Sequence, residues 1–515
     1  MAVGTLASRL TGFLRTLLQV YALGDVALAD AYNNANTLPN VVYNLALGGI
    51  LTSVIVPLIV NAASRDSDHG AGYDQRMFTL ITTALLAITV TATLATAVLV
   101  DLYKGGISGP ELRLLVIFAY FFIPQIFFYG MSSLIGAILN ARGSFAAPMW
   151  TPIINNVVVI VVLLMYMLVA SPGLATSRYP HAGGGVVLLL GLGTTLGIVA
   201  QTIALVPALR KVGFRWRPRW DFRRAESAEI GRMGGWMFCY VGATQLAFLV
   251  TTKVANDAQR FSGYNAYTYS WLLFQLPYAV VGISVITALL PRMSTHASER
   301  RFGLVRQDFS AGIRLAATIV VPCSLILAAI GPKLGEVLLA HGRTTIAEAH
   351  YIGVVFAVFT LGLLPYMIFQ LQLRVFYSLH DSKTPALIGL ATMTVNIVAN
   401  LIALAVLPAT TVVAGLGVGF GLANLVGVTL AWRILSLRLR GLDGYHITRS
   451  LVRMYAATVP AALLAILVGL IVGSAFGTVI IGGGLAIALY LLFARILRIE
   501  EISNLTHAVM SRFGR

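Results

Sequence analysis

The chain has 515 residues, of which 58% are hydrophobic and 11% are charged, and its mean hydropathy is +0.85. These values exclude a soluble globular protein and are typical of a protein that crosses a membrane many times. The net charge of +17 would suit a nucleic-acid-binding protein, but Lys and Arg lie mainly between apolar segments. In those places they act as topology signals and contact anionic headgroups, so no nucleic acid is expected as a partner.

Fourteen apolar segments have the length of membrane-spanning helices. The sequence therefore predicts an all-α integral membrane protein with 14 transmembrane helices. The segments lie near residues 1–23, 26–62, 77–100, 111–141, 147–170, 184–209, 227–256, 263–298, 308–330, 346–379, 384–407, 411–438, 448–473 and 476–497. Cys239 and Cys323 both fall within these segments and are expected to be core residues without a disulfide.

The first segment contains two arginines, Arg9 and Arg15. A cation inside a membrane span costs roughly 2.5 kcal/mol or more at the bilayer centre, so it usually faces a water-filled path or an anionic partner. The two residues lie six positions apart, which places them about 9 Å apart along a helix and roughly 120° apart around it. Both side chains can therefore reach into one wide lumen. For Arg9 the alternative is an anchor at the inner membrane face.

Prolines occur inside the four segments that are longer than a bilayer requires. A proline leaves one backbone carbonyl without its donor and bends the helix, which is tolerated where protein or water covers that side. These prolines are Pro39 and Pro57, Pro124, Pro277 and Pro291, and Pro365.

The distribution of Lys and Arg predicts the orientation of the chain. With the N-terminus inside, the inner loops and the C-terminal tail hold 23 Lys and Arg residues and the outer loops hold 5. The positive-inside rule then places both termini in the cytoplasm.

An internal repeat divides the segments into two groups of six. Pro124 and Pro365 are separated by 241 residues, and so are Asn155 and Asn396. An even number of helices per repeat gives both halves the same orientation, an arrangement found in transporters with a central cavity. The sequence predicts an N-terminal six-helix bundle at 1–209, a basic cytoplasmic linker at 210–226, a C-terminal six-helix bundle at 227–440, and two extra helices with a short tail at 441–515.

Two other functional classes receive little support. The linker interleaves tryptophan with arginine, which suits RNA binding, but a segment lying on lipid headgroups explains the same pattern. The sequence contains no phosphate-binding Gly-x-x-x-x-Gly-Lys motif and no metal-ligand spacing, so we expect no catalytic residues, no metal and no ATPase activity.

Five motifs, taken in order, resemble the MurJ (MviN) family of lipid II flippases, in the multidrug/oligosaccharidyl-lipid/polysaccharide (MOP) exporter superfamily. The similarity extends over essentially the whole chain. The motifs are Ser8-Arg9-Leu10-Thr11-Gly12-Phe13-Leu14-Arg15, Asn36-Thr37-Leu38-Pro39-Asn40, Ala137-Ile138-Leu139-Asn140 with Ala147-Pro148, Leu289-Leu290-Pro291 with Ser294, and Phe376-Tyr377-Ser378 with Asp381-Ser382-Lys383-Thr384-Pro385.

The resemblance implies that the protein moves lipid II, an undecaprenyl-pyrophosphate-linked muropeptide, from the inner to the outer leaflet of the bacterial cytoplasmic membrane. The two halves would alternate their access, with cavity cations binding the pyrophosphate. The resemblance implies no cofactor and a driving force from sodium, protons or the membrane potential. Membrane lipids and cell-wall synthesis proteins are the further partners that it implies.

The resemblance also assigns residues to cargo binding. Arg9 and Arg15 match the two arginines of the family's first segment, whereas Tyr43 and Leu272 occupy the positions of two further cavity arginines. Lys253 and Arg374 are candidates to replace that charge, and the alternative for both is an interfacial position reached by their long side chains.

Two groups of polar residues leave two interpretations open. Asn40 and Tyr43 belong to a polar start of the second segment that either lines the cavity or packs against the first segment. Asn396 and Asn400 lie on one helix face where some members of the family bind sodium. Hydrogen bonding between helices is the other use of these two amides.

We therefore interpret the chain as a lipid II flippase with two alternatives. One is another MOP exporter, which moves polysaccharide-lipids or exchanges drugs for cations. The other is a membrane scaffold for cell-wall enzymes that transports nothing.

Overall fold

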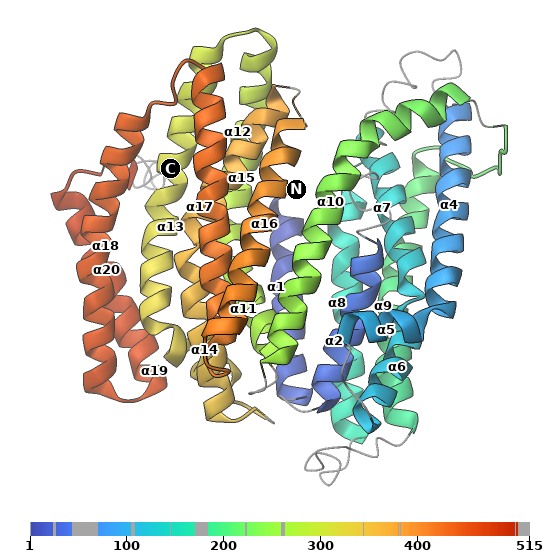
Figure 1. Ribbon diagram of the computed structural model, residues 1–515, viewed down its shortest axis with the longest axis horizontal. Coiled ribbons are helices and arrows are strands. Elements are labelled where there is room, and N and C mark those ends of the chain that lie inside the picture. The colour runs from blue at the N-terminus through green and yellow to red at the C-terminus, as the bar shows by residue number, and fades with distance from the viewer. Residues whose placement is uncertain are drawn as a thin grey trace. The chain divides into compact units, whose positions relative to one another are not determined.

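A computed structural model gives the structure of the chain and describes residues 2–23, 27–43, 71–104, 109–144, 146–169, 184–221, 224–258, 263–342, 344–379, 381, 383–499 and 501–502. All regular structure in these ranges is helical (Figure 1). The all-α fold class is therefore confirmed.

The helices follow the predicted segments closely. In the first half they are α1 (Ala2–Leu23), α2 (Ala27–Tyr43), α4 (Ala71–Leu94), α5 (Thr96–Lys104), α6 (Pro110–Phe122), α7 (Gln125–Ala141), α8 (Ala146–Val169), α9 (Gly184–Lys211) and α10 (Arg224–Asp257). In the second half they are α11 (Gly263–Pro277), η4 (Tyr278–Gly282), α12 (Ile283–Ser298), α13 (Phe302–Leu339), α14 (Ile346–Leu361), α15 (Leu363–Ser378), α16 (Lys383–Val406), α17 (Val412–Arg438), α18 (Gly444–Val472), α19 (Ala475–Gly477), η5 (Thr478–Gly482) and α20 (Gly483–Ile496).

By length and composition, nine helices in the described ranges are able to cross a membrane, or ten if a bent pair is one span. Three helices outside this count, α1, α2 and α10, contain the arginine, asparagine or lysine residues of the predicted binding site. The protein is thus a multi-pass membrane protein, and the number of 14 spans stays a prediction.

Three prolines of the long segments coincide with irregular backbone, whereas Pro39 and Pro291 lie inside the regular helices α2 and α12. The break between α6 and α7 lies at Pro124, and α14 and α15 meet at an angle of 47° just before Pro365. After Pro277 the helix widens into the π-helical turn η4. Proline donates no backbone hydrogen bond, so at each of these positions one carbonyl of the preceding turn lacks its usual donor, which favours a bend. Pro57 lies outside the described residues.

The chain forms two compact units, Met1–Leu249 and Val250–Arg515. The boundary falls inside α10, after the predicted linker. Most of α10 therefore belongs to unit 1, and unit 2 includes α18 to α20 together with the helices of the second repeat. The predicted domain limits stay a prediction.

The basic linker is an irregular segment that packs along the start of α4. Gln75 of α4 donates to the Arg215 carbonyl at 2.6 Å and accepts from the Arg217 amide at 2.6 Å. The Trp216 ring lies 5.4 Å from the Phe78 ring, and its indole donates to Thr79. The linker is thus held by specific contacts, while the side chains of Arg215, Arg217 and Arg219 stay exposed.

Unit 1 has an aromatic core between α2, α6 and α9. Tyr32 meets Phe118 and Phe122 edge-on, with ring centroids 5.8 and 5.3 Å apart. Its hydroxyl is 2.7 Å from the Thr194 hydroxyl of α9. This packing satisfies the phenol inside an apolar environment.

Unit 2 has an aromatic cluster of its own. Trp271, Phe274, Phe359, Tyr366 and Phe420 contact one another across α11, α14, α15 and α17.

The helices α13 and α14 of unit 2 pack very closely against each other through glycines. A Cβ at Gly335 would lie 2.4 Å from the Ala349 carbonyl and 2.8 Å from the Gly353 Cα. Only residues without a side chain allow this approach, as is common between membrane helices.

Candidate functional site

The first motif of the chain divides between helix packing and exposed charge. Asn156 of α8 donates to the Ser8 carbonyl at 3.2 Å and to the Thr11 hydroxyl at 3.0 Å. Gly12 faces the same amide, 3.5 Å from the position of a Cβ. Ser8 and Gly12 therefore hold α1 against α8, while Arg9 is exposed on the helix surface.

Arg15 lies deeper in the same helix and is half-buried. Its Nε is buried and has no hydrogen-bond partner among the described residues. A guanidinium group has five N–H donors, so Arg15 keeps donors available for a ligand. The role of Arg15 in cargo binding stays a prediction.

Two tyrosines lie near Arg15. The phenols of Tyr32 and Tyr129 lie within the range of its charge. Tyr129 of α7 is hydrogen-bonded to Asn40 of α2. The Tyr43 ring lies 6.3 Å from the Tyr129 ring, and the Tyr43 hydroxyl donates to Ser133 at 2.7 Å.

We call Arg15, Asn40, Tyr43, Tyr129 and Ser133 the Arg15 cluster. It combines one cation with hydroxyl and amide groups from α1, α2 and α7. Such a set suits an anionic group that carries neighbouring sugar hydroxyls or amides. Of the predicted residues, Asn40 and Tyr43 contact Tyr129, and Tyr129 in turn lies within the range of the Arg15 charge.

Sequence reasoning missed Tyr129 and Ser133. They follow the aromatic run Phe127-Phe128 and lie four positions apart, so they share one face of α7. Two polar residues on one face of a largely apolar helix were the feature of the sequence that could have indicated this position.

The first polar residues of α2 have partners within the protein. Gln19 of α1 donates to Asn33 at 2.6 Å, and Asn34 donates to Asp30 within α2. These three α2 residues are buried and support packing. Only the later residues, Asn40 and Tyr43, belong to the Arg15 cluster. Asn44 lies outside the described residues.

The predicted cations of unit 2 occupy different environments. Lys253 is exposed on α10. Arg374 of α15 is half-buried, lies over the Tyr377 ring at 5.9 Å, and has a buried Nε with no hydrogen-bond partner in the described part of the chain. Leu272, which occupies the position of a family arginine, is half-buried on α11.

The two asparagines of α16 connect it to α10. Asn400 donates to the Thr251 hydroxyl at 2.8 Å and to the Asn396 carbonyl oxygen at 3.2 Å. Both hydrogens of the Asn400 amide therefore have acceptors. No group of three or more His, Cys, Asp or Glu side chains able to hold a metal ion occurs among the residues that the structure describes. The contacts favour helix-to-helix bonding, and a cation site at Asn396 and Asn400 stays a prediction.

The last of the five motifs, which begins at Phe376, forms the corner between α15 and α16. Asp381 accepts from the Thr384 backbone amide at 3.0 Å, which caps the start of α16. Arg438, at the end of α17, forms an ion pair with Asp381, donates to Thr384 at 3.0 Å and lies 5.5 Å above the Phe376 ring. The motif is therefore explained by structure, and its central partner, Arg438, lies outside the motif.

The model of a family described as "Lipid II flippase MurJ" matches residues 19–485. A protein of Vibrio cholerae described as a probable lipid II flippase MurJ is 27% identical over 87% of this chain and 83% of its own length. A lipid II flippase MurJ of Burkholderia cenocepacia is 24% identical over 89% of this chain and 86% of its own length.

Solved structures show the same fold. A lipid II flippase MurJ in an inward closed conformation superimposes with a TM-score of 0.77 at 17% identity, over 97% of this chain and 99% of the other. An inward-facing multidrug resistance transporter of the MATE family, in the MOP superfamily, has a TM-score of 0.68 at 14% identity, over 85% of this chain and 99% of the other. Both are transporters built from membrane-spanning helices.

Proposed function

Because the chain belongs to the lipid II flippase MurJ family, a family of transporters rather than enzymes, we propose that it moves lipid II from the inner to the outer leaflet. Lipid II has a large, polar and anionic headgroup and a long apolar tail. A transporter for it needs cations for the pyrophosphate, polar groups for the sugar and peptide, and a path on which the tail stays in lipid.

The Arg15 cluster is the observation that carries this proposal. Arg15 supplies a cation with a free donor, its Nε, and Tyr129 supplies a hydroxyl group within the range of its charge, with Tyr43 packed against the Tyr129 ring. In the proposed mechanism Arg15 contacts the pyrophosphate, with Arg9, Lys253 and Arg374 as further cations. Asn40 and Tyr43 contact the sugar or peptide.

The remaining features of the proposal follow from the transporter class. Two halves that alternate their access carry the headgroup across, driven by sodium, protons or the membrane potential. The protein lies in the bacterial cytoplasmic membrane with both termini in the cytoplasm, as the excess of inner Lys and Arg indicates. Cell-wall synthesis proteins that supply or use the cargo are its proposed partners.

The test measures lipid II at the outer surface of the source cells with an external probe. The protein is depleted and then restored as wild type, Arg15→Ala, Tyr129→Phe or Arg113→Ala. We expect exposure of lipid II to fall on depletion, to recover with wild type and with Arg113→Ala, and to stay low with Arg15→Ala. Arg113 is a matched control because it is an exposed arginine of α6 outside the Arg15 cluster.

Tyr129→Phe tests the hydroxyl group alone. Loss of one hydrogen bond between neutral groups is worth about 0.5–1.5 kcal/mol, so transport should fall by roughly two- to ten-fold. Unchanged lipid II exposure on depletion, in cells without another flippase, would show that lipid II is not the cargo. A polysaccharide-lipid flippase, a drug antiporter or a scaffold would then replace the proposal.

A further inference from the structure

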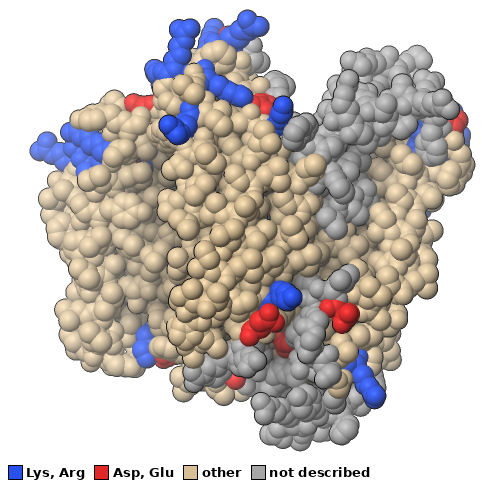
Figure 2. Space-filling model, viewed as in Figure 1, with Lys and Arg blue, Asp and Glu red and all other residues tan. Residues whose placement is uncertain are grey.

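Unit 2 contains a small basic cavity between the first turns of α18, the residues that follow α20, and α13. Its volume is about 330 Å³, at the lower end of the range of about 300–1,000 Å³ that is usual for ligand sites. Figure 2 shows Lys and Arg side chains gathered at this end of unit 2. The charged and titratable side chains that line the cavity are Arg314, His446, Arg449, Arg453, Arg498 and Glu501.

The carboxylates at this cavity balance only part of its positive charge. Glu501 is the one carboxylate among the lining residues that the structure describes, and it forms an ion pair with Arg314 at 3.0 Å. Asp443 lies close by, where it pairs with His446 and accepts a hydrogen bond from Ser310 of α13. Four arginines against two carboxylates leave an excess of two positive charges, before any charge on His446 is counted.

Several guanidinium donors of the cavity have no acceptor within the described part of the chain. Arg449 makes no hydrogen bond or ion pair with any described residue. Arg314 has a buried Nε without a hydrogen-bond partner there, and Arg453 donates to the Arg498 carbonyl at a long 3.4 Å. A phosphate group, which has several oxygen atoms, would therefore find donors from α13, from α18 and from the residues after α20.

Arg498 takes a backbone conformation that glycine usually adopts. Its φ is +51°, in the left-handed region that commonly follows the end of a helix. The Ile499 amide donates to the Ala494 carbonyl at 3.0 Å and closes this turn after α20. A side chain in this conformation costs free energy relative to glycine, and here the side chain is a cation that lines the cavity.

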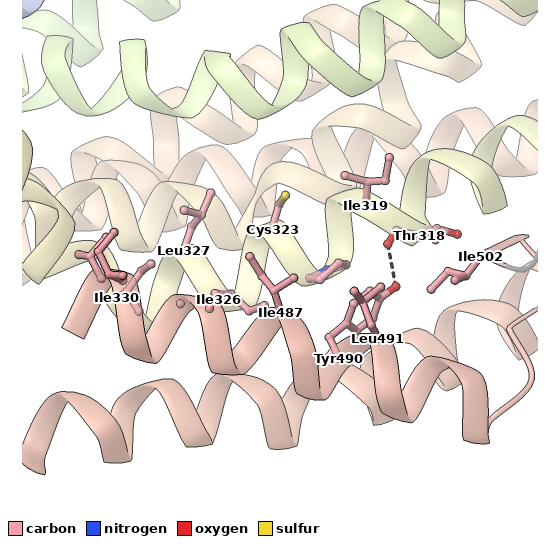
Figure 3. Close-up of a pocket in the computed structure, with 15 residues that line it drawn as sticks. Thr318, Ile319, Cys323, Ile326, Leu327, Ile330, Ile487, Tyr490, Leu491 and Ile502 are labelled. Atoms are coloured by element: carbon pink, nitrogen blue, oxygen red, sulfur yellow. Dashed lines mark hydrogen bonds between the residues drawn. The ribbon is translucent and has the colours of Figure 1, made fainter. Parts of the chain in front are cut away.

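The surroundings of the cavity restrict its ligand to a small, water-soluble group. On the outer side the cavity meets solvent, because Arg449 and Arg498 are exposed. Beyond Arg314 the space between α13 and α20 is apolar, as Figure 3 shows with Ile319, Ile487 and Leu491, and no charged side chain occurs among the described residues that line it. A second polar group of the ligand would lose its hydration in that space without gaining a partner.

We propose that this cavity binds a compact soluble phosphate compound with at least two negative charges, such as a diphosphate or a phosphate monoester. Arg449, Arg453 and Arg498 bind the phosphate oxygens, and Arg314 closes the inner side. The distribution of Lys and Arg in the sequence assigns this end of unit 2 to the cytoplasm, so the ligand is a cytoplasmic solute.

The proposed ligand has a structural effect on unit 2. It relieves the repulsion among the arginines and connects α13 with α18 and with the turn after α20, so it determines how firmly the C-terminal helices are held. The site shares no residue with the Arg15 cluster, so it is separate from the proposed cargo site.

The purified full chain in a neutral detergent provides the test, with inorganic pyrophosphate as the probe. Thermal unfolding is followed during titration with pyrophosphate, or with sodium chloride at the same ionic strength. We expect pyrophosphate to raise the unfolding temperature in a saturable way, because it binds the folded state. Sodium chloride should raise it little, because a monovalent anion only screens the charges.

A competition experiment identifies the source of the phosphate. Phosphatidylglycerol, added to the detergent micelles, carries one negative charge on a phosphate diester, whereas pyrophosphate carries at least two. We expect phosphatidylglycerol to leave the apparent affinity for pyrophosphate unchanged.

The double variant Arg449→Gln/Arg453→Gln tests the assigned residues. It should weaken the apparent affinity for pyrophosphate by roughly ten-fold or more, because charge-assisted hydrogen bonds to the phosphate are lost. Arg495→Gln is the matched control, since Arg495 is an exposed arginine on the last turn of α20 outside the cavity. It should bind pyrophosphate as the wild type does.

Glu501→Gln tests the cavity with the opposite sign. This change removes the lining carboxylate and releases Arg314 from its ion pair, so pyrophosphate should bind roughly two- to five-fold more tightly, the effect of one partly exposed charge. A variant that merely folds badly would not gain affinity. Glu501→Gln therefore decides the question if the double variant fails to fold.

Three results would overturn the proposal. Sodium chloride reproducing the full shift would reduce the effect to screening. Displacement of pyrophosphate by phosphatidylglycerol would make a lipid headgroup the occupant in place of a soluble compound. Wild-type affinity in both Arg449→Gln/Arg453→Gln and Glu501→Gln would show that the anion binds elsewhere.

Discussion

At the scale of single residues, buried polar groups decide between structure and function. A polar side chain inside a membrane must find a partner, and that partner is either another helix or a ligand. Asn400 has no exposed surface and uses both amide hydrogens between α10 and α16. Its Oδ1 and the Nε of Arg15, however, are both buried without a partner in the described residues.

The contacts of Asn400 predict a loss of stability on truncation. Asn400→Ala should lower the free energy of unfolding by about 0.6–2 kcal/mol, because one inter-helix hydrogen bond is lost. Thermal unfolding in detergent measures this effect. Thr394→Ala, on an exposed position of the same helix, is the control.

A comparison of the wild type with Asn400→Ala also tests the predicted cation site at Asn396 and Asn400. Stability of the wild type and of Asn400→Ala is measured with sodium and with potassium. We expect the two salts to act alike on both proteins. A sodium-specific stabilisation of the wild type that Asn400→Ala abolishes would establish a cation site in place of a packing contact.

At the scale of helices, corners depend on residues that are distant in sequence. Arg438 holds the α15–α16 corner through Asp381 and Thr384. In unit 1, Arg142 follows α7, pairs with Asp74 of α4 and donates to the Val212 carbonyl at 2.9 Å. Each unit thus uses one arginine to hold a corner between two helices.

The Asp381 corner predicts a dependence of stability on pH. Partial burial raises the pKa of the Asp381 carboxyl, but hydrogen bonds from Thr384 and Arg438 and the Arg438 charge outweigh it, so the pKa lies below its usual value. A carboxyl with a lowered folded-state pKa stabilises the fold above its unfolded pKa of about 4 and loses this effect as the pH falls through the folded value.

Asp381→Asn should therefore lower the free energy of unfolding by about 1 kcal/mol or less at neutral pH, since both partners are partly exposed. The difference between variant and wild type should shrink as the pH falls below about 4. Thermal unfolding between pH 3 and pH 7 checks it. A difference that stays constant over this range would show that the carboxylate charge is not responsible.

The close contact between α13 and α14 gives a second prediction for a helix. Gly335→Ala places a methyl group 2.4 Å from the Ala349 carbonyl, so the helices must separate. We expect a loss of about 1–3 kcal/mol of stability, as for other overpacked positions. Gly303→Ala, near the start of the same helix with open space around it, is the control and should be neutral or slightly stabilising.

At the scale of the whole molecule, the orientation in the membrane is a prediction from the sequence that labelling can test. Single cysteines are introduced as Arg217→Cys or His341→Cys in a background of Cys239→Ala/Cys323→Ala. A membrane-impermeant maleimide should label His341→Cys in intact cells and Arg217→Cys only after permeabilisation. The opposite pattern would invert the proposed topology.

The sequence by itself determined the class of fold and the positions of the helices. Hydropathy and the spacing of charges are local properties, and a membrane span needs about 20 apolar residues whatever its neighbours are. The predicted segment 147–170 and α8, Ala146–Val169, agree almost to the residue. The helix breaks at Pro124 and Pro365 were equally predictable, because proline lacks a backbone donor.

The tertiary structure decided which polar residues act together. Tyr129 and Ser133 join Arg15, and Arg438 joins Asp381, because the fold brings distant helices into contact. A cavity of unit 2, near the start of α18, is likewise lined by Arg314, Arg453 and Arg498, which are far apart in the chain. Side-chain partners depend on the packing of whole helices, and a linear pattern of residue types does not specify that packing.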